Sequence, residues 1–507
     1  MGLVSRSNLW IWACKLVLKP IVSVMAEISL GLSFDDVLLV PQHSAVIPNE
    51  TNISSWLTKD IGLNIPVVSA AMDSVSESEL AIALAREGGI GVIHRNNTIE
   101  EQAAMVARVK RSENAVIHHP VTVTKEMTLA DVRGIIAEEG FSGFPVVGPG
   151  NQLEGMVTGR DIGYAENQNR LVADVMTPID RLVVAPADTC IEDARRILYE
   201  NRIEKLPLID GFGKLAGLIT GADIEKRMTF TNSAKDANGQ LRCGAAVGPG
   251  PDHMDRATAL VAAGVDALFI DAATGHTQVV IDVIKNLSTL GVPVVAGNVV
   301  TAQGARDLCD AGVSAVKVGV GPGSICTTRV VAGVGMPQFT AIENVASVCR
   351  ERGVAVIADG GIRYSGDVVK AMAAGADLVM LGSLLAGTRE SPGQTVHFQG
   401  RRFKTYRGMG SLGAMRKGSK DRYSQNASGK MVAEGVEGRV PYKGSVADVV
   451  FQLMGGLRSG LGYVGAEDLK TLRERAVFTQ ITAGGLRESH AHDITITEEP
   501  TNYQPLG

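Results

Sequence analysis

Eight short apolar runs recur along this chain of 507 residues, and most of them end in small or glycine-rich turns. Helix-like stretches lie between most of them, such as residues 77–87, 255–263, 302–311 and 366–374. Strands that alternate with helices form parallel α/β folds, and eight units favour closure into a (β/α)8 TIM barrel over a doubly wound open sheet. The eight runs are residues 65–72, 91–94, 242–247, 267–271, 293–298, 315–320, 354–359 and 378–382.

Unusual polar residues stand where several of these runs end, namely Asp271, Asn298, the loop around Cys326, Asp359 and Ser383. The active site of a barrel enzyme forms at the carboxyl ends of the strands, where all of these residues would meet. The sequence therefore predicts that they surround one pocket.

Residues 321–329 read Gly-Pro-Gly-Ser-Ile-Cys-Thr-Thr-Arg and place Cys326 in a glycine-rich turn. Glycine lets the backbone approach a ligand closely, and unpaired amides in such a turn attract anions. A thiol there is a candidate nucleophile, and we expect the loop amides and Arg329 to favour its thiolate form. The alternative is a buried structural cysteine. We expect that role for most of the other cysteines, which are Cys14, Cys190, Cys243, Cys309 and Cys349.

The composition argues for small-molecule chemistry. A net charge of −5, a hydrophobic content of 45% and 58 glycines describe a globular chain without the basic surface of a nucleic-acid-binding protein. No cysteine pair has the spacing of a zinc site, and six thiols do not make a secreted disulfide scaffold, which predicts a reducing, cytoplasmic location. Residues 1–25 form an atypical extension whose apolar stretch is interrupted by two lysines and a proline, so we expect no membrane anchor.

The alternation breaks between about residues 114 and 229, where an internal repeat occurs. Phe144-Pro-Val-Val and Gly155-Met-Val-Thr-Gly-Arg-Asp-Ile return 62 residues later as Leu206-Pro-Leu-Ile and Gly217-Leu-Ile-Thr-Gly-Ala-Asp-Ile. We predict two pseudo-symmetric copies, at about 114–173 and 174–228, inserted into a barrel made of residues 26–113 and 229–507.

The repeat resembles tandem CBS domains. In that family the Thr-Gly-x-Asp segment commonly contacts the ribose and phosphate of a purine nucleotide such as ATP or GTP. The resemblance implies that role for Thr158, Asp161, Thr220 and Asp223. A purely structural spacer is the alternative.

Residues 392–445 are rich in glycine, basic residues and tyrosine and show little periodicity. So long an irregular stretch in a compact domain is usually a lid or binding loop, and we predict a mobile flap.

Taken together, long motifs in fixed order resemble those of the inosine-5′-monophosphate (IMP) dehydrogenases over roughly residues 30–505. They are Phe34-Asp-Asp-Val-Leu-Leu-Val-Pro, Gly321-Pro-Gly-Ser-Ile-Cys-Thr-Thr-Arg, Ala358-Asp-Gly-Gly-Ile-Arg, Tyr406-Arg-Gly-Met-Gly-Ser and Glu434-Gly-Val-Glu-Gly-Arg-Val-Pro-Tyr-Lys-Gly.

The resemblance implies that Cys326 attacks the purine carbon, that a hydride leaves to NAD, and that the covalent thioimidate is hydrolysed to xanthosine monophosphate. It assigns activation of the water to Arg422, with Tyr423 beside it and Thr328 near the water. An arginine base is chemically awkward because guanidinium has a pKa above about 12, so a solvated flap charge is the alternative.

The resemblance also implies the binding residues. Those for IMP are Ser324, Asp359, Gly360, Gly361, Gly382, Ser383, Tyr406, Arg407, Gly408, Met409, Gly410 and Glu434. Those for NAD are Asp271, Gly319, Val320 and Gly321, since the chain has no suitable G-x-G-x-x-G fingerprint. Ala272 and Thr274 depart from the family pattern beside Asp271, and the departure predicts altered contacts with NAD.

A potassium ion is implied at the carbonyls of Gly321, Gly323 and Cys326. The family completes that site with a neighbouring subunit, here Glu488, Ser489 and His490, which implies a homotetramer and leaves octamers open. Two rival functions remain at this stage. GMP reductase ordinarily lacks the insert and the Arg-Tyr flap, and a non-catalytic nucleotide sensor would not need Cys326, Thr328, Asp359 and Arg422 together.

Overall fold

The computed structural model describes residues 28–112, 116–117, 120–140, 142–163, 169–222, 224–225, 230–418, 431–498 and 500–503. The chain divides into two units, residues 1–31 and 32–507, and every helix and strand below belongs to the second. The extension predicted at residues 1–25 lies outside the described residues.

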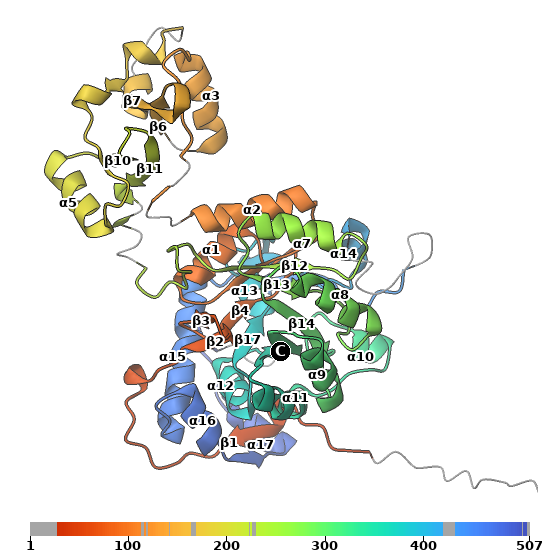
Figure 1. Cartoon of the computed structure of the whole chain (residues 1–507). Helices are drawn as coiled ribbons and strands as arrows, with labels where there is room; N and C mark the ends of the chain where they lie inside the picture. Colours follow the sequence, from red (N-terminus) through yellow and green to blue (C-terminus); the bar gives the residue numbers. More distant parts are fainter. Residues whose placement is uncertain are drawn as a thin grey trace, which may run out of the picture. The chain divides into compact units, whose positions relative to one another are not determined.

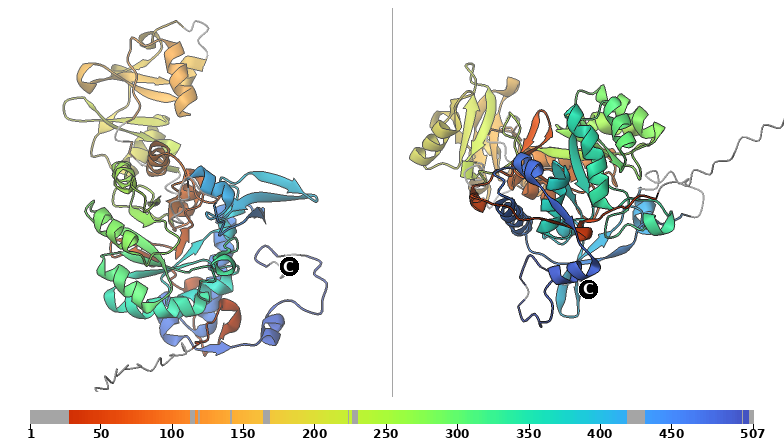
Figure 2. Two further views of the ribbon diagram at one scale, coloured as in Figure 1. Left: turned by 90° about the vertical axis from the view of Figure 1, so that its right-hand side faces the viewer. Right: turned by 90° about the horizontal axis from the view of Figure 1, so that it is seen from below.

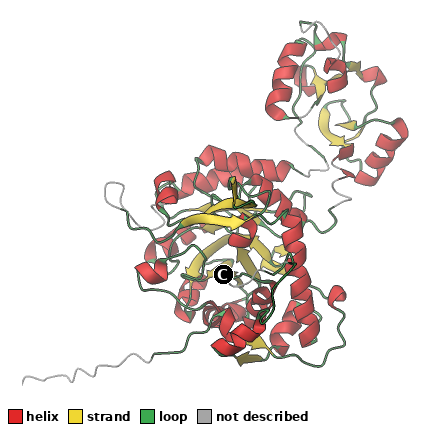
Figure 3. Cartoon of the chain, turned by 180° about the vertical axis from the view of Figure 1, so that it is seen from behind, coloured by secondary structure: helices red, strands yellow, loops and turns green. Residues whose placement is uncertain are grey.

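Eight parallel strands form the central sheet (Figures 1 and 3). Their order is β4-β17-β16-β15-β14-β13-β12-β5, and a parallel bridge between Val68 and Ile90 brings the two end strands together, so that the barrel is nearly closed. Each of the eight predicted runs contains one strand, which confirms the parallel barrel. The strands are β4 (Val67–Ser69), β5 (Gly91–Ile93), β12 (Cys243–Val247), β13 (Ala267–Ile270), β14 (Val294–Val299), β15 (Ala315–Val318), β16 (Ala355–Asp359) and β17 (Leu378–Leu381).

Helices surround the strands, and the four helix-like stretches predicted above correspond to α1, α7, α9 and α12 (Figures 2 and 3). The strands are buried on both faces, as expected for near-continuous apolar runs in a parallel sheet. The surrounding helices are α1 (Ser78–Arg86), α2 (Ile99–Arg111), α7 (His253–Ala262), α8 (Gln278–Ser288), α9 (Ala302–Asp310), α11 (Gln338–Arg352), α12 (Ser365–Ala374), α15 (Val446–Val464) and α16 (Leu469–Arg475).

Two hydrophobic cores hold the barrel together. One fills its inside with side chains such as Phe269, Ile357 and Met380, and the antiparallel pair β2 (Ser55–Thr58) and β3 (Ile61–Leu63) adds to it. The larger core lies between the outer faces of the strands and the helices. The fold thus positions the carboxyl ends of the strands on a rigid scaffold.

The repeat predicted at residues 114–228 folds as two copies with the same strand register. Gly143 pairs with Thr158 between β6 (Gly143–Val147) and β7 (Leu153–Thr158), and Lys205 pairs with Thr220 between β10 (Lys205–Ile209) and β11 (Leu215–Thr220). Each strand pair follows a helix, α3 (Leu129–Glu139) or α5 (Ile191–Asn201), and each copy has its own apolar core.

The two copies exchange short segments. Ile117, near the start of the first copy, pairs with Leu218 of the second, whereas Thr177, near the start of the second, pairs with Met156 of the first. This reciprocal exchange explains why two similar copies form one pseudo-symmetric module.

The flap predicted at residues 392–445 is more regular than expected. It contains β18 (Thr395–Phe398), β19 (Arg401–Arg407), α14 (Leu412–Lys417) and β20 (Glu437–Pro441), and the three strands form an antiparallel sheet (light blue in Figure 2). β20 is mostly exposed and β19 buries only Lys404 and Tyr406, so neither strand alternates between apolar and polar residues, and the alternation of β18 covers only four residues. Residues 419–430, which include Arg422 and Tyr423, lie outside the described part of the chain.

A buried ion cluster joins the two ends of the barrel sequence that flank the insert. Lys110, which is 4% exposed, lies 2.8 Å from a carboxylate oxygen of Asp236 and 2.8 Å from one of Asp266. Burial alone would raise the pKa of Asp236, but the hydrogen bond and charge of Lys110 hold that pKa below its ordinary value. Since Lys110 precedes the insert and Asp236 follows it, the ion pair fixes both connections between the barrel and the insert.

Among the described residues, no helix is long and apolar enough to cross a membrane.

Lys110→Met should reduce the free energy of unfolding by about 3 kcal/mol, because it removes the cation paired with Asp236 and leaves Asp266 with Arg242 alone. The matched control is Lys125→Met, which breaks the exposed ion pair between Lys125 and Glu154 and should cost less than about 1 kcal/mol. Urea unfolding of both variants measures the difference, and equal losses would contradict this account of the cluster.

Candidate active site

A cavity of about 400 Å³ opens at the carboxyl ends of the barrel strands, a size typical of small-molecule sites. It brings together eighteen of the residues predicted from the sequence for catalysis, substrate, cofactor or cation. They are Asp271, Gly319, Val320, Gly321, Gly323, Ser324, Cys326, Thr328, Asp359, Gly360, Gly361, Gly382, Ser383, Tyr406, Gly408, Met409, Gly410 and Glu434.

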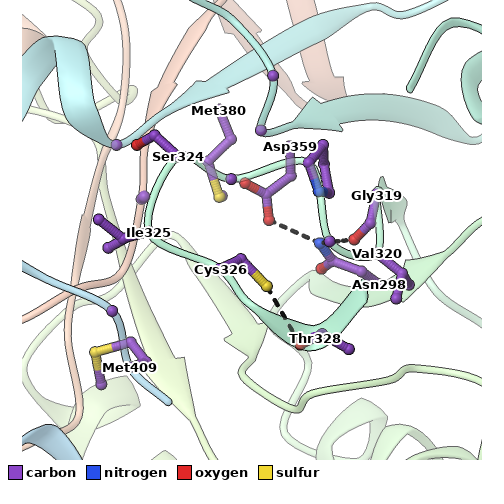
Figure 4. A pocket seen from close by; sticks show the side chains of 18 of the residues that line it. Asn298, Gly319, Val320, Ser324, Ile325, Cys326, Thr328, Asp359, Met380 and Met409 are labelled. Carbon is purple, nitrogen blue, oxygen red and sulfur yellow. Dashed lines mark hydrogen bonds between the residues drawn. The ribbon is translucent and has the colours of Figure 1, made fainter. Parts of the chain in front are cut away.

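The thiol of Cys326 begins a short chain of hydrogen bonds. Its sulfur lies 3.2 Å from the hydroxyl of Thr328 (Figure 4), and that hydroxyl donates over 2.8 Å to a carboxylate oxygen of Glu434. A carboxylate at the end of the chain can receive a proton that leaves the thiol. The sequence analysis predicted Glu434 only as an IMP-binding residue and missed its connection to the thiol.

Backbone pairing holds the cysteine loop in place. Cys326 forms an antiparallel bridge with Gly435; the Thr327 amide donates to the Glu434 carbonyl over 3.0 Å, and the Val436 amide donates to the Ile325 carbonyl over 3.0 Å. Residues 434–436 are bonded in turn to residues 408–410. Three segments far apart in the sequence are therefore fixed against one another around the thiol.

Arg329, which was predicted to favour the thiolate form of Cys326, forms hydrogen bonds to backbone carbonyls. Its guanidinium donates to the carbonyls of Val320 and Met336, so it braces the loop through the backbone. Gly321 makes room for it: the backbone has a φ of +82°, and a Cβ there would lie 2.5 Å from the Arg329 side chain.

Asp359, at the end of β16, is oriented by a buried amide. Asn298 donates from Nδ2 to a carboxylate oxygen of Asp359 and to the carbonyl of Gly319, each over 2.8 Å (Figure 4). Lys317, which is 5% exposed inside the barrel, donates to the Asn298 side-chain oxygen over 3.0 Å and fixes which way the amide points. One carboxylate oxygen of Asp359 is thereby held in place by Asn298. The carboxylate has further lone pairs that can accept hydrogen bonds from the hydroxyl groups of a ligand.

Three supporting residues were not predicted. Lys317 lies within an apolar strand run. A lysine at such a position indicates a buried polar partner, here Asn298, and sequence reasoning could have used this signal. Gln338, at the start of α11, donates to the carbonyls of Val318 and Asp359 and so ties β15 to β16. Arg95 is the second residue after β5, and its Nε lies 3.1 Å from the carboxylate of Asp271, with both side chains buried.

A cradle of small residues and hydroxyl groups lies on another side of the cavity. Gly360 and Gly361 have φ values of +91° and +81°, which glycine adopts readily. A Cβ on Gly382 would lie 2.8 Å from the Tyr406 hydroxyl. Burial raises the pKa of Tyr406, and its hydrogen bond with Ser324 acts in the opposite direction, so the phenol stays a neutral donor at ordinary pH.

Ala272 and Thr274 do not line the cavity, whereas Ala273 does. Ala272 is 4% exposed and belongs to the core between strands and helices, so its methyl group serves packing. The altered contacts with NAD predicted from these two residues therefore have no counterpart in the lining of the pocket.

Other predicted residues lie away from the cavity. Arg407 forms an ion pair with Asp73. Burial alone would raise the pKa of Asp73, but Arg407 and Asn96 hold it below its ordinary value. Glu488 and Ser489 belong to α17 (Ala483–Ser489), and His490 follows that helix and contacts Tyr364 and Tyr503. The described residues contain no cluster of three His, Cys, Asp or Glu side chains that could hold a metal ion.

The residues predicted in the insert have local partners. The Thr158 hydroxyl and amide both bond a carboxylate oxygen of Asp161 over 2.8 Å, as in a capped helix start. Thr220 ends β11 at the equivalent place, and Asp223 lies outside the described residues.

A parallel barrel that presents a hydrogen-bonded cysteine at the carboxyl ends of its strands is the arrangement of an enzyme that works by covalent catalysis. A sequence model of the IMP dehydrogenase / GMP reductase domain matches residues 31–492. The chain belongs to this IMP dehydrogenase / GMP reductase family.

Curated relatives resemble the chain over nearly its full length. The inosine-5′-monophosphate dehydrogenase of Aquifex aeolicus is 55% identical over 487 residues, which cover 95% of this chain and 99% of the relative. That of Bacillus subtilis is 53% identical over 477 residues, which cover 93% of this chain and 98% of the relative.

A solved structure also resembles the chain. A cysteine-to-alanine variant of the GMP reductase of Trypanosoma brucei, in complex with guanosine 5′-monophosphate, superposes with a TM-score of 0.86 at 40% identity. The match covers 93% of this chain and 99% of that one.

Gly319→Ala should disrupt the cavity, because its φ of +136° disfavours alanine and a Cβ would lie 2.3 Å from the Asp359 carbonyl oxygen. We expect a loss of at least about 3 kcal/mol in the free energy of unfolding. Gly366→Ala in α12, where a Cβ meets nothing within 4 Å, is the control and should cost nothing. Urea unfolding compares them, and a Gly319→Ala protein as stable as the control would contradict the close approach.

Proposed function

We propose that this chain is an IMP dehydrogenase, which oxidises IMP to xanthosine 5′-monophosphate with NAD. One observation carries the proposal: a single cavity holds the Cys326 thiol, with its hydrogen-bonded path to Glu434, together with the oriented carboxylate of Asp359. The names of the curated relatives at 53–55% identity agree with it.

The cavity suits a nucleoside monophosphate. Asp359 would accept the two ribose hydroxyls, since a carboxylate accepts two hydrogen bonds at once. Ser324, Gly361, Gly382, Ser383 and Tyr406 would surround the phosphate, where small residues let backbone amides approach an anion. The lining residues Gly408, Met409, Gly410 and Glu434 would then contact the base.

In the first half of the reaction the Cys326 thiolate would add to the purine carbon C2. Loss of hydride from C2 then leaves a thioimidate between Cys326 and the base. Bound NAD supplies the acceptor for that hydride. The thiol proton would pass through Thr328 to Glu434, which the hydrogen-bond chain supports.

The residues present fit NAD, because all four residues predicted to bind it line the same cavity as the phosphate cradle. A Cβ at Gly319 would collide with neighbouring backbone, so glycine keeps space at the cavity floor. Asp271 lines the same region and is held by Arg95, which leaves it able to accept a hydroxyl group.

In the second half, water would hydrolyse the thioimidate, release xanthosine 5′-monophosphate and restore the Cys326 thiol. We assign activation of the water to Arg422, with Tyr423 and Thr328 beside it. Division into a redox and a hydrolytic half is what a covalent intermediate permits.

A potassium ion at the carbonyls of Gly321, Gly323 and Cys326 fits the donor set, since backbone carbonyl oxygens suit a hard monovalent cation. Glu488, Ser489 and His490 would complete the site from a neighbouring subunit, and a homotetramer follows from that sharing. His490 contacts Tyr364 and Tyr503 of its own chain, and none of Glu488, Ser489 and His490 lines the cavity of its own chain, which is compatible with such sharing.

Residues 114–228 would be tandem CBS domains that bind a regulatory purine nucleotide, ATP or GTP, near Thr158, Asp161, Thr220 and Asp223. The repeated strand register and the exchanged segments support a pair of similar units inserted between residues 26–113 and 229–507.

GMP reductase is the second candidate function. The insert does not separate the two reactions, because the match to the Trypanosoma brucei GMP reductase covers 93% of this chain, which a protein without the insert could not reach. Identity favours IMP dehydrogenase, at 55% against 40%. A non-catalytic sensor is disfavoured by the intact bonds around Cys326 and Asp359.

Purified protein given IMP and NAD should produce NADH, followed by its absorbance, and Cys326→Ala should abolish this while leaving IMP affinity within a few-fold. The exposed Cys190 provides the control variant Cys190→Ala, which should keep the full rate. If Cys326→Ala still made NADH at a comparable rate, the covalent mechanism would be wrong. If the wild type instead consumed NADPH with GMP and made no NADH from IMP, the chain would be a reductase.

Arg422→Ala should separate the two halves of the reaction. A rapid burst of NADH about equal to the enzyme concentration should remain, followed by a steady state about 10²–10⁴-fold slower, the usual contribution of a general base. Stopped-flow absorbance measures both phases. Absence of the burst would place Arg422 in binding or hydride transfer, and normal turnover would reduce it to a solvated charge.

Removal of residues 115–228, with the ends rejoined, should preserve basal NADH formation and abolish any response to ATP or GTP. The reason is that inserted domains usually leave their ends close in space. Steady-state rates with and without nucleotide test this. A folded, inactive product would show that the insert is needed for more than regulation.

A further inference from the structure

Two cysteines of the outer helices face each other. Cys309, in the last turn of α9, and Cys349, in the last turn of α11, have their sulfur atoms 4.0 Å apart. The two helices pack side by side (Figure 1), and their cysteines are separated by 40 residues in the sequence. The chain has only six cysteines among its 507 residues, so two of them rarely come into contact by chance. The contact therefore indicates a role for this pair.

The surroundings hold the two sulfur atoms together. Arg352, three residues after Cys349, forms an ion pair with Asp310, which directly follows Cys309. Cys349 is buried, whereas Cys309 is half-buried and accessible to a small reagent from outside. The sequence analysis expected a structural role for both because neither lies in a glycine-rich loop.

We propose that Cys309 and Cys349 are a redox site that forms a reversible disulfide by exchange with a low-molecular-weight disulfide such as glutathione disulfide. The Cys309 thiolate attacks one sulfur of the reagent, which forms a mixed disulfide and releases one glutathione thiolate. Cys349 then attacks the Cys309 sulfur, closes the disulfide and releases the second glutathione. Two protein thiols are oxidised, one reagent disulfide is reduced to two thiols, and the two protein protons pass to the released glutathione.

The environment assigns the order of the two steps. The hydrogen-bonded contact between the two sulfur atoms lowers the pKa of Cys309, and the nearby Arg352 guanidinium acts in the same direction. The same hydrogen bond together with burial raises the pKa of Cys349. Since Cys309 is half-buried and Cys349 is buried, the reagent reaches Cys309 first, and the lowered pKa of Cys309 agrees with its role as the attacking thiolate.

The position of the pair predicts what the disulfide does. Helices of a (β/α)8 barrel run antiparallel to the strands, so the C-terminal ends of α9 and α11 lie at the amino ends of the strands, opposite the active site. The disulfide would tie neighbouring helices that follow β14 and β15. It therefore acts on stability and leaves the geometry around Cys326 unchanged.

Peptide mapping tests the proposal directly, because trypsin places the relevant cysteines on separate peptides. Cys309 lies on residues 307–317, Cys326 on 318–329, Cys349 on 330–350 and Cys190 on 182–195. The full-length wild-type protein is incubated with glutathione disulfide, blocked with iodoacetamide and digested without reductant. We expect peptides 307–317 and 330–350 to appear as one cross-linked species that dithiothreitol separates.

Cys190 is the matched control, since it is an exposed thiol on the insert with no second cysteine beside it among the described residues. It should carry glutathione and form no cross-link. Cys349→Ser should convert Cys309 to a mixed disulfide with glutathione, and Cys309→Ser should leave Cys349 free to react with iodoacetamide after unfolding. A wild-type Cys309 that carries glutathione while Cys349 stays a free thiol would overturn the proposal, as would cross-links to Cys326 at equal yield.

Thermal unfolding supplies an independent measurement. The oxidised wild type should unfold a few degrees above the reduced protein, because a disulfide that closes a loop of 40 residues restricts the unfolded chain. Oxidised Cys349→Ser should show no such increase. An unchanged midpoint in a fully cross-linked wild type would contradict the stabilising role. None of these measurements depends on the identity of the substrate.

Discussion

The backbone pairing between the cysteine loop and residues 434–436 is the interaction on which the site depends. Cys326 is bridged to Gly435, and the amides and carbonyls on either side are bonded as in two antiparallel strands. The thiol belongs to the loop after β15, whereas its partners belong to the flap region of residues 392–445, more than 100 residues later. Any displacement of residues 434–436 therefore reaches the loop that carries the nucleophile.

A second constraint is the burial of polar groups inside the barrel. Lys317, Asn298 and Asp359 form a continuous hydrogen-bonded row, and Gln338 bonds the backbone beside it. Buried polar groups are costly unless each finds a partner, so such a row fixes one arrangement of side chains. The barrel thus supplies a rigid floor with a directed carboxylate, and the cysteine loop lies beside it at the same cavity.

The sequence analysis predicted the barrel well because each strand is an apolar run that needs no partner to be recognised. All eight runs contain a strand, and the polar residues at their ends do surround one cavity.

Contacts between elements were harder to predict. The bonds of Glu434 to Thr328 and of Arg95 to Asp271 depend on how the barrel closes, which no local pattern encodes. Strands β19 and β20 were missed because their residues do not alternate between apolar and polar, and β18 because its alternation covers only four residues. Arg422 and Tyr423 lie outside the described residues and stay predictions.

The central claim is that Cys326 carries the substrate during turnover. The most direct test is to quench the reaction of the protein with IMP and NAD in the steady state and to map its tryptic peptides by mass spectrometry. The account predicts a purine nucleotide attached to the peptide of residues 318–329 at Cys326, present only when both IMP and NAD were added. NADH formation with no adduct on that peptide, or with the nucleotide on another cysteine, would contradict it.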